Sequence, residues 1–368
     1  MYISSQDERF FHAALDLGRR GLGATAPNPA VGAMVVKDGV IVGRGWTQPG
    51  GRPHAEPLAL AQAGAAARGA TLYVTLEPCA HHGKTPPCAE AIVASGVARV
   101  VGGLTDPDSR VAGQGFSLLR AAGLAVESDV MRQLCLRANL GHVLRVTQNR
   151  PMVTLKIART ADGQAAAGEH DRRLAITGLA ANLRTHVLRA QHDAIMVGIG
   201  TVLADDPLMT VRLPGCTHRP LRVILDARLD LPPLSRVVAG ARETPVLAIC
   251  GKEASSSRRE ALQAAGVEVV DCATRGDGRL DLRAALGLLA ERGLTRVFSE
   301  GGPRVGAALI AEGLADEVVL FTSPKPLGRP GVPALAPEAL AALADKKAFR
   351  QAEEGFYGID AFTVYERR

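Results

Sequence analysis

Apolar and polar positions alternate along the first third of the chain in two different periods, and together they predict alternating helices and strands. Residues 6–19 place Phe10, Ala13 and Leu17 on one face, which is typical of an amphipathic helix. Runs at 31–36 and 40–45 around Lys37-Asp38-Gly39 predict a β-hairpin. The next elements expected are a helix over 54–68, a strand over 71–76, a helix over 87–95, a strand over 98–104, a helix over 115–122 and a strand over 124–128. A hairpin followed by βαβ units predicts a mostly parallel sheet with helices on both faces.

The rest of the chain predicts a second α/β domain. A polar, helical connector is expected over 130–150, and it ends before Pro151 because a proline disfavours helical backbone in the residue before it. Apolar, β-branched runs then predict strands over 152–157, 194–197, 221–225, 246–249, 267–270, 297–300 and 318–322, separated by helical stretches. A chain of 368 residues is also too long for one ordinary core. We therefore expect two α/β domains, over 1–148 and 149–368, without an internal repeat.

The composition limits the cellular compartment and the classes of molecule that we expect the protein to bind. Hydrophobic residues make up 47% and charged residues 22%, as in globular proteins. There is no run of about 18 apolar residues and no signal-like start, so we expect a cytoplasmic protein that has no contact with a membrane. The net charge of +6 is spread in short pairs such as Arg172-Arg173, and only 4% of residues are aromatic. This distribution argues against nucleic-acid binding and suits small anionic substrates, such as phosphorylated metabolites.

Two of the six cysteines differ from the others in their surroundings. Cys79 and Cys88 each follow a proline, and histidines lie near both in the sequence. Together with His54 they offer one nitrogen and two sulfur ligands, the set that a catalytic zinc uses when its fourth position stays open for water. Zinc lowers the pKa of a thiol, and so does a helix N-terminus, which we expect around Cys88 with Pro87 at the first helical position.

Glu56 completes the candidate catalytic chemistry. Zinc lowers the pKa of a bound water to about 7. Glu56 follows His54 by two residues, so it can accept the water's proton and pass it to a departing amine. The order H-x-E followed by P-C is the signature of zinc deaminases, but eight residues, not two, separate the two cysteines here. The alternative is a structural zinc with His81 or His82 as a fourth ligand.

Three residues near this motif are candidate substrate contacts. In the insert between the cysteines, we expect His81 to contact the substrate and Lys84 to meet a phosphate. Asn28, in the segment 27–32, is placed to recognise the amide edge of a pyrimidine. Ordinary loop and turn roles remain the alternatives for these three residues.

The second domain carries weaker signals. The segment 198–200 lacks the third glycine of the dinucleotide-binding fingerprint. Residues 301–306 follow a predicted strand directly, and a glycine turn that opens a helix exposes backbone N–H groups to a phosphate. Residues 200–212 hold many hydrogen-bonding groups between two apolar stretches. A plain connection between strand and helix is the alternative for the glycine turn.

The segments 27–32, 54–56 and 75–88 resemble the bifunctional riboflavin-biosynthesis deaminase/reductase family (RibD), and the resemblance covers essentially the whole chain. It implies a cytidine-deaminase-like three-layer αβα domain followed by a dihydrofolate-reductase-like α/β domain. In that family the first domain deaminates 2,5-diamino-6-ribosylamino-4(3H)-pyrimidinone 5′-phosphate. The second domain reduces the ribosyl side chain to give 5-amino-6-ribitylaminouracil 5′-phosphate. The implied cofactors are Zn²⁺ and NADPH.

The resemblance also implies roles for residues of the second domain. The positions that match NADPH contacts are Ala158, Ala175, Thr201, Asp205, Gly302, Pro303, Arg304, Val305 and Gly306. The positions that match substrate contacts are Arg173, Arg189, Met209, Arg212 and Glu300. Ala175 stands where the family has a tryptophan, Arg173 falls near its serine, and Ala227 replaces another serine.

Three other interpretations stay open at this point. The departures at Ala175, Arg173 and Ala227 motivate a deaminase with a degenerate reductase domain. An isoelectric point near 9.2 motivates a nucleic-acid deaminase. A regulatory module that uses zinc structurally is the third. We expect a homo-oligomer that acts on a small phosphorylated pyrimidine.

Overall fold

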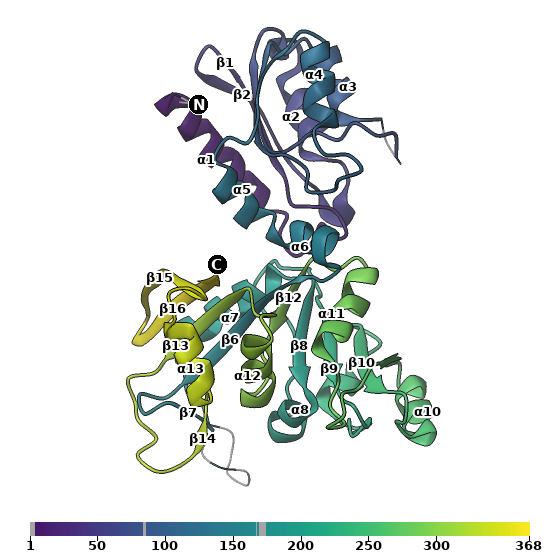
Figure 1. Cartoon of the computed structure of the whole chain (residues 1–368), viewed down its shortest axis with the longest axis vertical. Coiled ribbons are helices and arrows are strands. Elements are labelled where there is room, and N and C mark those ends of the chain that lie inside the picture. Colours follow the sequence, from purple (N-terminus) through teal and green to yellow (C-terminus); the bar gives the residue numbers. More distant parts are fainter. Residues whose placement is uncertain (1–3, 84–85, 167, 169–173) are drawn as a thin grey trace. The chain divides into compact units, whose positions relative to one another are not determined.

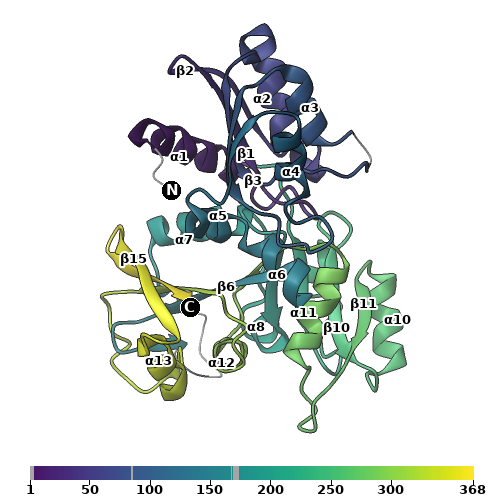
Figure 2. The same cartoon turned by 45° about the horizontal axis from the view of Figure 1, so that its top comes forward.

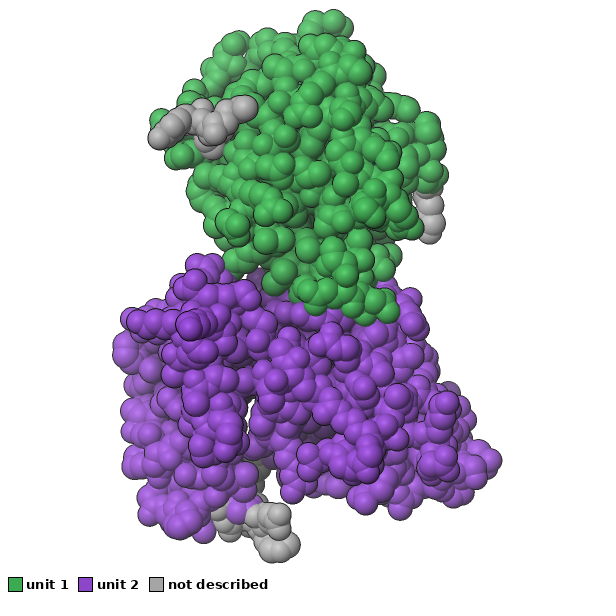
Figure 3. Space-filling view, in the orientation of Figure 1, with its two compact units in different colours: residues 1–149 green, residues 150–368 purple. Residues whose placement is uncertain are grey.

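The structure is a computed structural model that describes residues 4–83, 86–166, 168 and 174–368. The chain divides into two compact units, Met1–Asn149 and Arg150–Arg368 (Figure 3). Both units are α/β, as the apolar pattern predicts (Figure 1). Within the described ranges, no helix has the length and apolar character needed to cross a bilayer.

The first unit is built on a five-stranded sheet with three layers. Its strand order is β2 (Val40–Trp46), β1 (Gly32–Lys37), β3 (Thr71–Leu76), β4 (Arg99–Leu104) and β5 (Ala125–Glu127). Strand β1 is antiparallel to both of its neighbours, while β3, β4 and β5 are parallel. One face carries α1 (Ser5–Arg19) and α5 (Arg132–Ala138), and the other carries α2 (Ala55–Ala63), α3 (Cys88–Ser95) and α4 (Gln114–Ala121) (Figure 1, Figure 2). Helix α6 (Leu140–Gln148) follows α5 and ends the unit.

Helix α2 lies unusually close to strand β2, and this contact sets the position of its first turn. A Cβ atom at Gly43 would stand 2.0 Å from the Ala59 carbonyl oxygen, and one at Gly45 would stand 2.1 Å from the Ala55 carbonyl oxygen. Glycine is therefore required at both strand positions for the backbones to approach. The single helix expected over 54–68 ends at Ala63, because Gly64 has a φ of 52°, and a 3₁₀ turn over Gly64–Ala67 follows.

The second unit is built on a nine-stranded sheet. Its order is β11 (Glu268–Cys272), β10 (Val246–Gly251), β9 (Leu221–Leu225), β8 (Ala194–Gly198), β12 (Arg296–Ser299), β6 (Met152–Arg159), β13 (Glu317–Thr322), β16 (Asp360–Arg367) and β15 (Phe349–Tyr357). The strands from β11 to β13 are parallel, and β16 and β15 are antiparallel to their neighbours. A small separate sheet pairs β7 (Gln164–Ala166) with β14 (Val332–Pro333).

Apolar side chains on both faces of this sheet hold the helices of the second unit. On one face Leu155 and its neighbours pack against α11 (Leu282–Glu291), α12 (Pro303–Ala311) and α13 (Pro337–Ala344). On the other face Ile195 and its neighbours pack against α8 (Ile199–Asp205), α9 (Arg236–Ala239) and α10 (Ser256–Ala264), and Phe298 packs against α7 (Leu179–Ala190). The expected division into two α/β domains, the first with three αβα layers, is confirmed.

Two elements of the second unit differ from the sequence-based expectation. The first six residues of the cluster over 200–212 belong to helix α8, which begins at Ile199. The chain also ends in the antiparallel hairpin β15–β16, which was not predicted. Strand β16 alternates buried and half-buried positions, with Phe362 and Val364 facing the core, so the alternation was visible in its sequence.

A buried ion pair joins the first residue of the second unit to its sheet. The Arg150 guanidinium donates to both oxygens of Asp316 at 2.7 Å, and the Val153 amide donates to the same carboxylate at 2.8 Å. We expect Asp316→Ala to lower the free energy of unfolding of this unit by about 3–5 kcal/mol, because it removes the carboxylate from a buried ion pair. Urea unfolding followed by circular dichroism measures the change. The exposed Asp277→Ala is the control, and a loss below about 1 kcal/mol for Asp316→Ala contradicts the prediction.

Candidate active site

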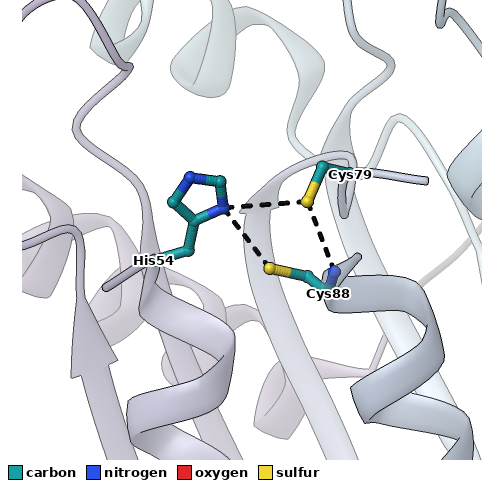
Figure 4. A group of neighbouring side chains, drawn as sticks. All are labelled: His54, Cys79 and Cys88. Atoms are coloured by element: carbon teal, nitrogen blue, oxygen red, sulfur yellow. Dashed lines mark hydrogen bonds between the residues drawn. The ribbon is translucent and has the colours of Figure 1, made fainter. Parts of the chain in front are cut away.

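Three different elements bring the predicted metal ligands together in the first unit (Figure 4). His54 is the N-cap residue of α2, Cys79 lies just beyond the end of β3, and Cys88 is the first residue of α3. Pro87 is the N-cap of α3, one position before the place expected for it. The backbone N–H of Cys88 donates to the Cys79 sulfur at 3.3 Å, so the start of α3 holds the Cys79 side chain close to Cys88.

The spacing of the ligand atoms fits a zinc ion. The Nδ1 atom of His54 lies 3.7 Å from the Cys79 sulfur and 3.4 Å from the Cys88 sulfur. All three ligand atoms lie within 4.8 Å of one another. A tetrahedral zinc with ordinary Zn–N and Zn–S bonds places such atoms roughly 3.6 Å apart. With three protein ligands, this arrangement leaves a fourth position for water or substrate.

The electrostatics of the ligand group favour a cation. A hydrogen bond from the Cys88 thiol lowers the pKa of Cys79 to about 4, and the same contact raises the pKa of Cys88 well above its usual range. The hydrogen bond with Cys79 raises the pKa of His54. The two cysteines are therefore coupled through their shared contact. A Zn²⁺ ion held by them would stabilise both as thiolates.

Glu56 lies in the first turn of α2, two residues after the histidine ligand, and its side chain is buried, with 3% of the residue exposed. Burial raises the pKa of Glu56 to about 7, against the opposing influence of the His54 charge. A carboxylate with this pKa both accepts and releases a proton near neutral pH. Glu56 also interacts with Cys88, so it stands beside the ligands without belonging to the ligand group.

A cavity of about 390 Å³ opens onto this group, which is within the range for small-molecule sites. His54, Glu56, Cys79, Asn28 and His81 line it. The Asn28 amide nitrogen donates to the Gly51 carbonyl oxygen at 2.8 Å and lies 3.3 Å from Nε2 of His54. The Asn28 amide nitrogen is thus engaged by Gly51 and His54, so the Asn28 amide oxygen is the atom that can bind a ligand. Lys84 lies outside the described residues.

Sequence reasoning missed the opposite wall of this cavity. It is lined by Arg52, Glu77, Asp106, Asp108, Arg110, Val111 and His142. The Glu77 carboxylate accepts hydrogen bonds from the backbone amides of Asp106, Gly113, Gly115 and Phe116 at 2.8–3.2 Å, so it holds the whole loop after β4. Glu77 follows β3 and Asp106 follows its parallel neighbour β4. Ligands bind beyond the carboxyl ends of such strands, which is the signal that could have found both residues.

In the second unit, two predicted substrate contacts form a half-buried ion pair with each other. The Arg189 guanidinium donates to both oxygens of Glu300, at 2.5 and 2.9 Å, and to the Thr210 carbonyl oxygen at 2.9 Å. Burial alone would raise the pKa of Glu300, but the Arg189 charge outweighs it and holds the pKa below its usual value. All three donor nitrogens of Arg189 are therefore engaged inside the protein.

The other predicted substrate contacts, Arg212 and Met209, differ in how far their side chains are exposed to solvent. Arg212 donates to the Thr210 hydroxyl at 3.0 Å and is exposed, so it has the better access to a phosphate. The Met209 side chain is buried, with 2% of the residue exposed and a φ of 51°, so only its backbone is placed to meet a ligand. Arg173 lies outside the described residues.

The residues that match NADPH contacts gather at one edge of the sheet. Ala158 lies at the carboxyl end of β6, α8 with Thr201 and Asp205 follows β8, and the turn at Gly302 follows β12. These three strands are parallel neighbours. The Gly302 amide donates to the Thr201 hydroxyl at 3.1 Å, which joins the starts of α8 and α12. The glycine turn does open a helix, with Gly302 as N-cap and Pro303 at the first position. Ala175, in contrast, is exposed in the irregular segment before α7.

Comparison with known proteins gives a consistent result for each half of the chain. Residues 4–104 match the family model for the cytidine and deoxycytidylate deaminase zinc-binding region. Residues 151–354 match the model for the RibD C-terminal domain. The riboflavin biosynthesis protein RibD of Aquifex aeolicus is 41% identical over 89% of this chain and 89% of its own length. The Escherichia coli protein of the same name is 36% identical over 96% of this chain and 98% of its own length.

Solved structures agree with these sequence matches. Acinetobacter baumannii RibD superposes with a TM-score of 0.86 at 34% identity, and 99% of each chain is covered. A diaminohydroxyphosphoribosylaminopyrimidine deaminase/5-amino-6-(5-phosphoribosylamino)uracil reductase from Thermotoga maritima superposes with a TM-score of 0.84 at 34% identity, again over 99% of each chain. These likenesses extend over both units.

Proposed function

The chain belongs to the RibD family of bifunctional riboflavin biosynthesis enzymes, and on that premise we propose the substrates and the residues of its two reactions. The first unit is a deaminase and the second is a reductase. None of the comparisons favours a degenerate reductase domain. The observation that carries the deaminase assignment is the His54/Cys79/Cys88 group with Glu56 buried beside it.

In the first unit, the substrate is 2,5-diamino-6-ribosylamino-4(3H)-pyrimidinone 5′-phosphate. His54, Cys79 and Cys88 hold Zn²⁺, which when bound supplies an activated water for hydrolysis. Glu56 takes a proton from the attacking water and returns it to the departing amine, so ammonia leaves as a neutral group. The Asn28 amide oxygen and His81 contact the pyrimidine, and Lys84 contacts the phosphate.

In the second unit, the ribosyl side chain of the deaminated product is reduced to ribityl. NADPH supplies the hydride when bound. We place its phosphates at the start of α12, where Arg304 and Val305 carry backbone amides in the first turn after Pro303, with Thr201 and Asp205 on the neighbouring helix α8. Ala158 and Ala175 are further proposed cofactor contacts. Arg212 and Arg173 meet the substrate phosphate, and the Met209 backbone contacts the substrate. The Arg189–Glu300 pair forms the wall against which the sugar lies.

One coupled assay tests both halves of this proposal. With the diamino-pyrimidinone phosphate alone, we expect ammonia release and accumulation of the 5-amino-6-ribosylaminouracil phosphate. With NADPH added, we expect one NADPH oxidised per product molecule and the ribityl compound by mass spectrometry. Metal analysis is expected to find one zinc per chain. Ammonia release without any NADPH oxidation would instead establish a deaminase that lacks reductase activity.

We also propose the surroundings in which the enzyme works. It acts in the cytoplasm on small molecules without nucleic acid, and it assembles into a homo-oligomer. The exposed apolar side chains Leu179 and Leu183 on α7, with Phe356 and Ile359 at the tip of the β15–β16 hairpin, support a contact between copies. Light scattering on the purified chain measures the oligomeric state. Absence of RNA and DNA binding at physiological salt checks the other expectation.

A further inference from the structure

We propose that His142, held beside Asp106, is a specificity residue of the deaminase that binds the hydroxyl groups of the substrate's pentose. This inference rests on the proposed deamination of a ribosylamino-pyrimidine. His142 comes from α6, and it lines the same cavity as His54, Cys79 and Glu56. Its role is to bind substrate, because it lies among none of the groups that move protons.

The two ring nitrogens of His142 are the observation that carries this proposal. Both are shielded from solvent and have no hydrogen-bond partner in the parts of the chain that the structure describes. The closest polar atom is Asp106 Oδ1, at 3.6 Å from Nε2, which is longer than a hydrogen bond. A buried, unmatched polar ring destabilises the folded protein by about 1–3 kcal/mol unless a ligand or water completes it. The His142 ring is therefore placed to form a hydrogen bond with a polar group of a ligand inside this cavity.

The charges around His142 favour a hydroxyl over a phosphate. Asp106 and Asp108 both line this cavity, and a carboxylate repels an anion. The Arg110 guanidinium donates to both oxygens of Asp108 and offsets its charge, so Asp106 is the carboxylate that stands beside His142. A hydroxyl group donates and accepts at once, so it complements an imidazole N–H beside a carboxylate. Adjacent hydroxyl groups of a pentose match such a pair of partners.

The geometry of the cavity places a pentose at this wall. The amino group that leaves must lie against the zinc ligands and Glu56. The rest of the substrate then extends along the remaining lining, which includes residues of the loop over 106–111 and His142. The Glu77 carboxylate fixes that loop through four backbone amides, so Asp106 is a rigid partner for the histidine.

Steady-state deamination by His142→Phe and His142→Gln in the full-length zinc enzyme tests the proposal. Phenylalanine fills the space without a donor, and we expect the KM for the ribosylamino substrate to rise about five- to tenfold with kcat changed less than threefold. Glutamine keeps an N–H near the Nε2 position, and we expect it to restore KM to within about threefold of the wild type. NADPH oxidation by the second unit and the zinc content are the controls, and both are expected to stay unchanged.

Two further probes distinguish the hydroxyl groups from the phosphate. For a counterpart that lacks the 2′- and 3′-hydroxyl groups, we expect His142→Phe and wild type to have the same KM. For the dephosphorylated counterpart, the five- to tenfold difference is expected to persist. An unchanged KM for His142→Phe on the ribosylamino substrate overturns the role of His142, as does an effect that disappears with the phosphate or a loss of zinc in both variants.

The failure of the underlying function gives a different result. If the wild type itself does not deaminate the ribosylamino-pyrimidinone phosphate, the proposed substrate is wrong. Titration calorimetry of that compound into Glu56→Gln, with and without His142→Phe, measures binding apart from turnover. The added His142→Phe change is expected to raise Kd by the same five- to tenfold factor, and an unchanged Kd overturns the proposal.

Discussion

Glu56→Gln is expected to lower deamination by at least about 10³-fold while the protein keeps its zinc and its fold. Glutamine has the size of glutamate but neither accepts nor releases the proton that hydrolysis requires. The folded state tolerates the change, because a neutral amide is easier to bury than a carboxylate at this fully enclosed position. The loss should therefore appear in kcat, with the thermal transition and the bound zinc unchanged.

The control for this variant is Glu8→Gln. Glu8 also lies in the first turn of a helix of the same unit, but it is exposed and stands outside the cavity. It should retain full activity. If zinc were purely structural, Glu56→Gln would keep its activity and removal of zinc by a chelator would unfold the first unit. Retention of more than a tenth of the wild-type rate by Glu56→Gln thus argues for that interpretation and against ours.

Arg189→Lys is expected to lower NADPH-dependent reduction on the order of 100-fold and to leave deamination within twofold. Lysine keeps the positive charge but has no planar fork, so it cannot bind both oxygens of Glu300 and the Thr210 carbonyl oxygen together. The segment over 209–212 and the carboxylate of Glu300 then lose their fixed positions. We expect the KM for the deaminated intermediate to rise together with a fall in kcat.

A matched control lies on the same helix. Arg184 packs its guanidinium over the Tyr357 ring, 5.9 Å from the centroid, a contact that lysine can also make. Arg184→Lys should therefore reduce the intermediate at nearly the wild-type rate. A loss below threefold for Arg189→Lys would show that the ion pair does not position the substrate. A parallel loss of deamination would indicate general unfolding.

The zinc site could be predicted from sequence because its chemistry is local. His54 and Glu56 are two residues apart, and Cys79 and Cys88 flank a single loop, so residue types and spacing were sufficient. The opposite wall of the cavity has no such signature. His142 sits 54 residues beyond Cys88 in a connector helix, and nothing in its neighbourhood marks it as part of the cavity. Only the folding of α6 brings it there.

The second unit shows the same limit. Its parallel strands were predicted from apolar runs, because each is buried on both faces. Arg189 and Glu300 are 111 positions apart, so the sequence around either residue does not indicate that they pair. Those residues were named only through the resemblance to a family, and the structure adds that the arginine is engaged by the glutamate. The hairpin β15–β16 could have been predicted from the alternation of apolar and polar residues in β16. The many charged residues on its exposed face made that alternation hard to recognise.

Because Glu77 holds its loop through main-chain amides, members of this family can change side chains of the loop and keep its shape. The carboxylate binds main-chain amides, which every residue type except proline provides, so the shape of the loop is independent of most of its side chains. Positions 110 and 111 are thus open to substitution without loss of the scaffold. Asp108 is not, since its carboxylate accepts from the Arg110 amide, and neither is Gly115, where a Cβ atom would stand 2.0 Å from the Pro78 carbonyl oxygen. A library randomised at 110 and 111, with Glu77, Asp108 and Gly115 kept, is where deaminases with new preferences at the sugar end of the substrate should be sought.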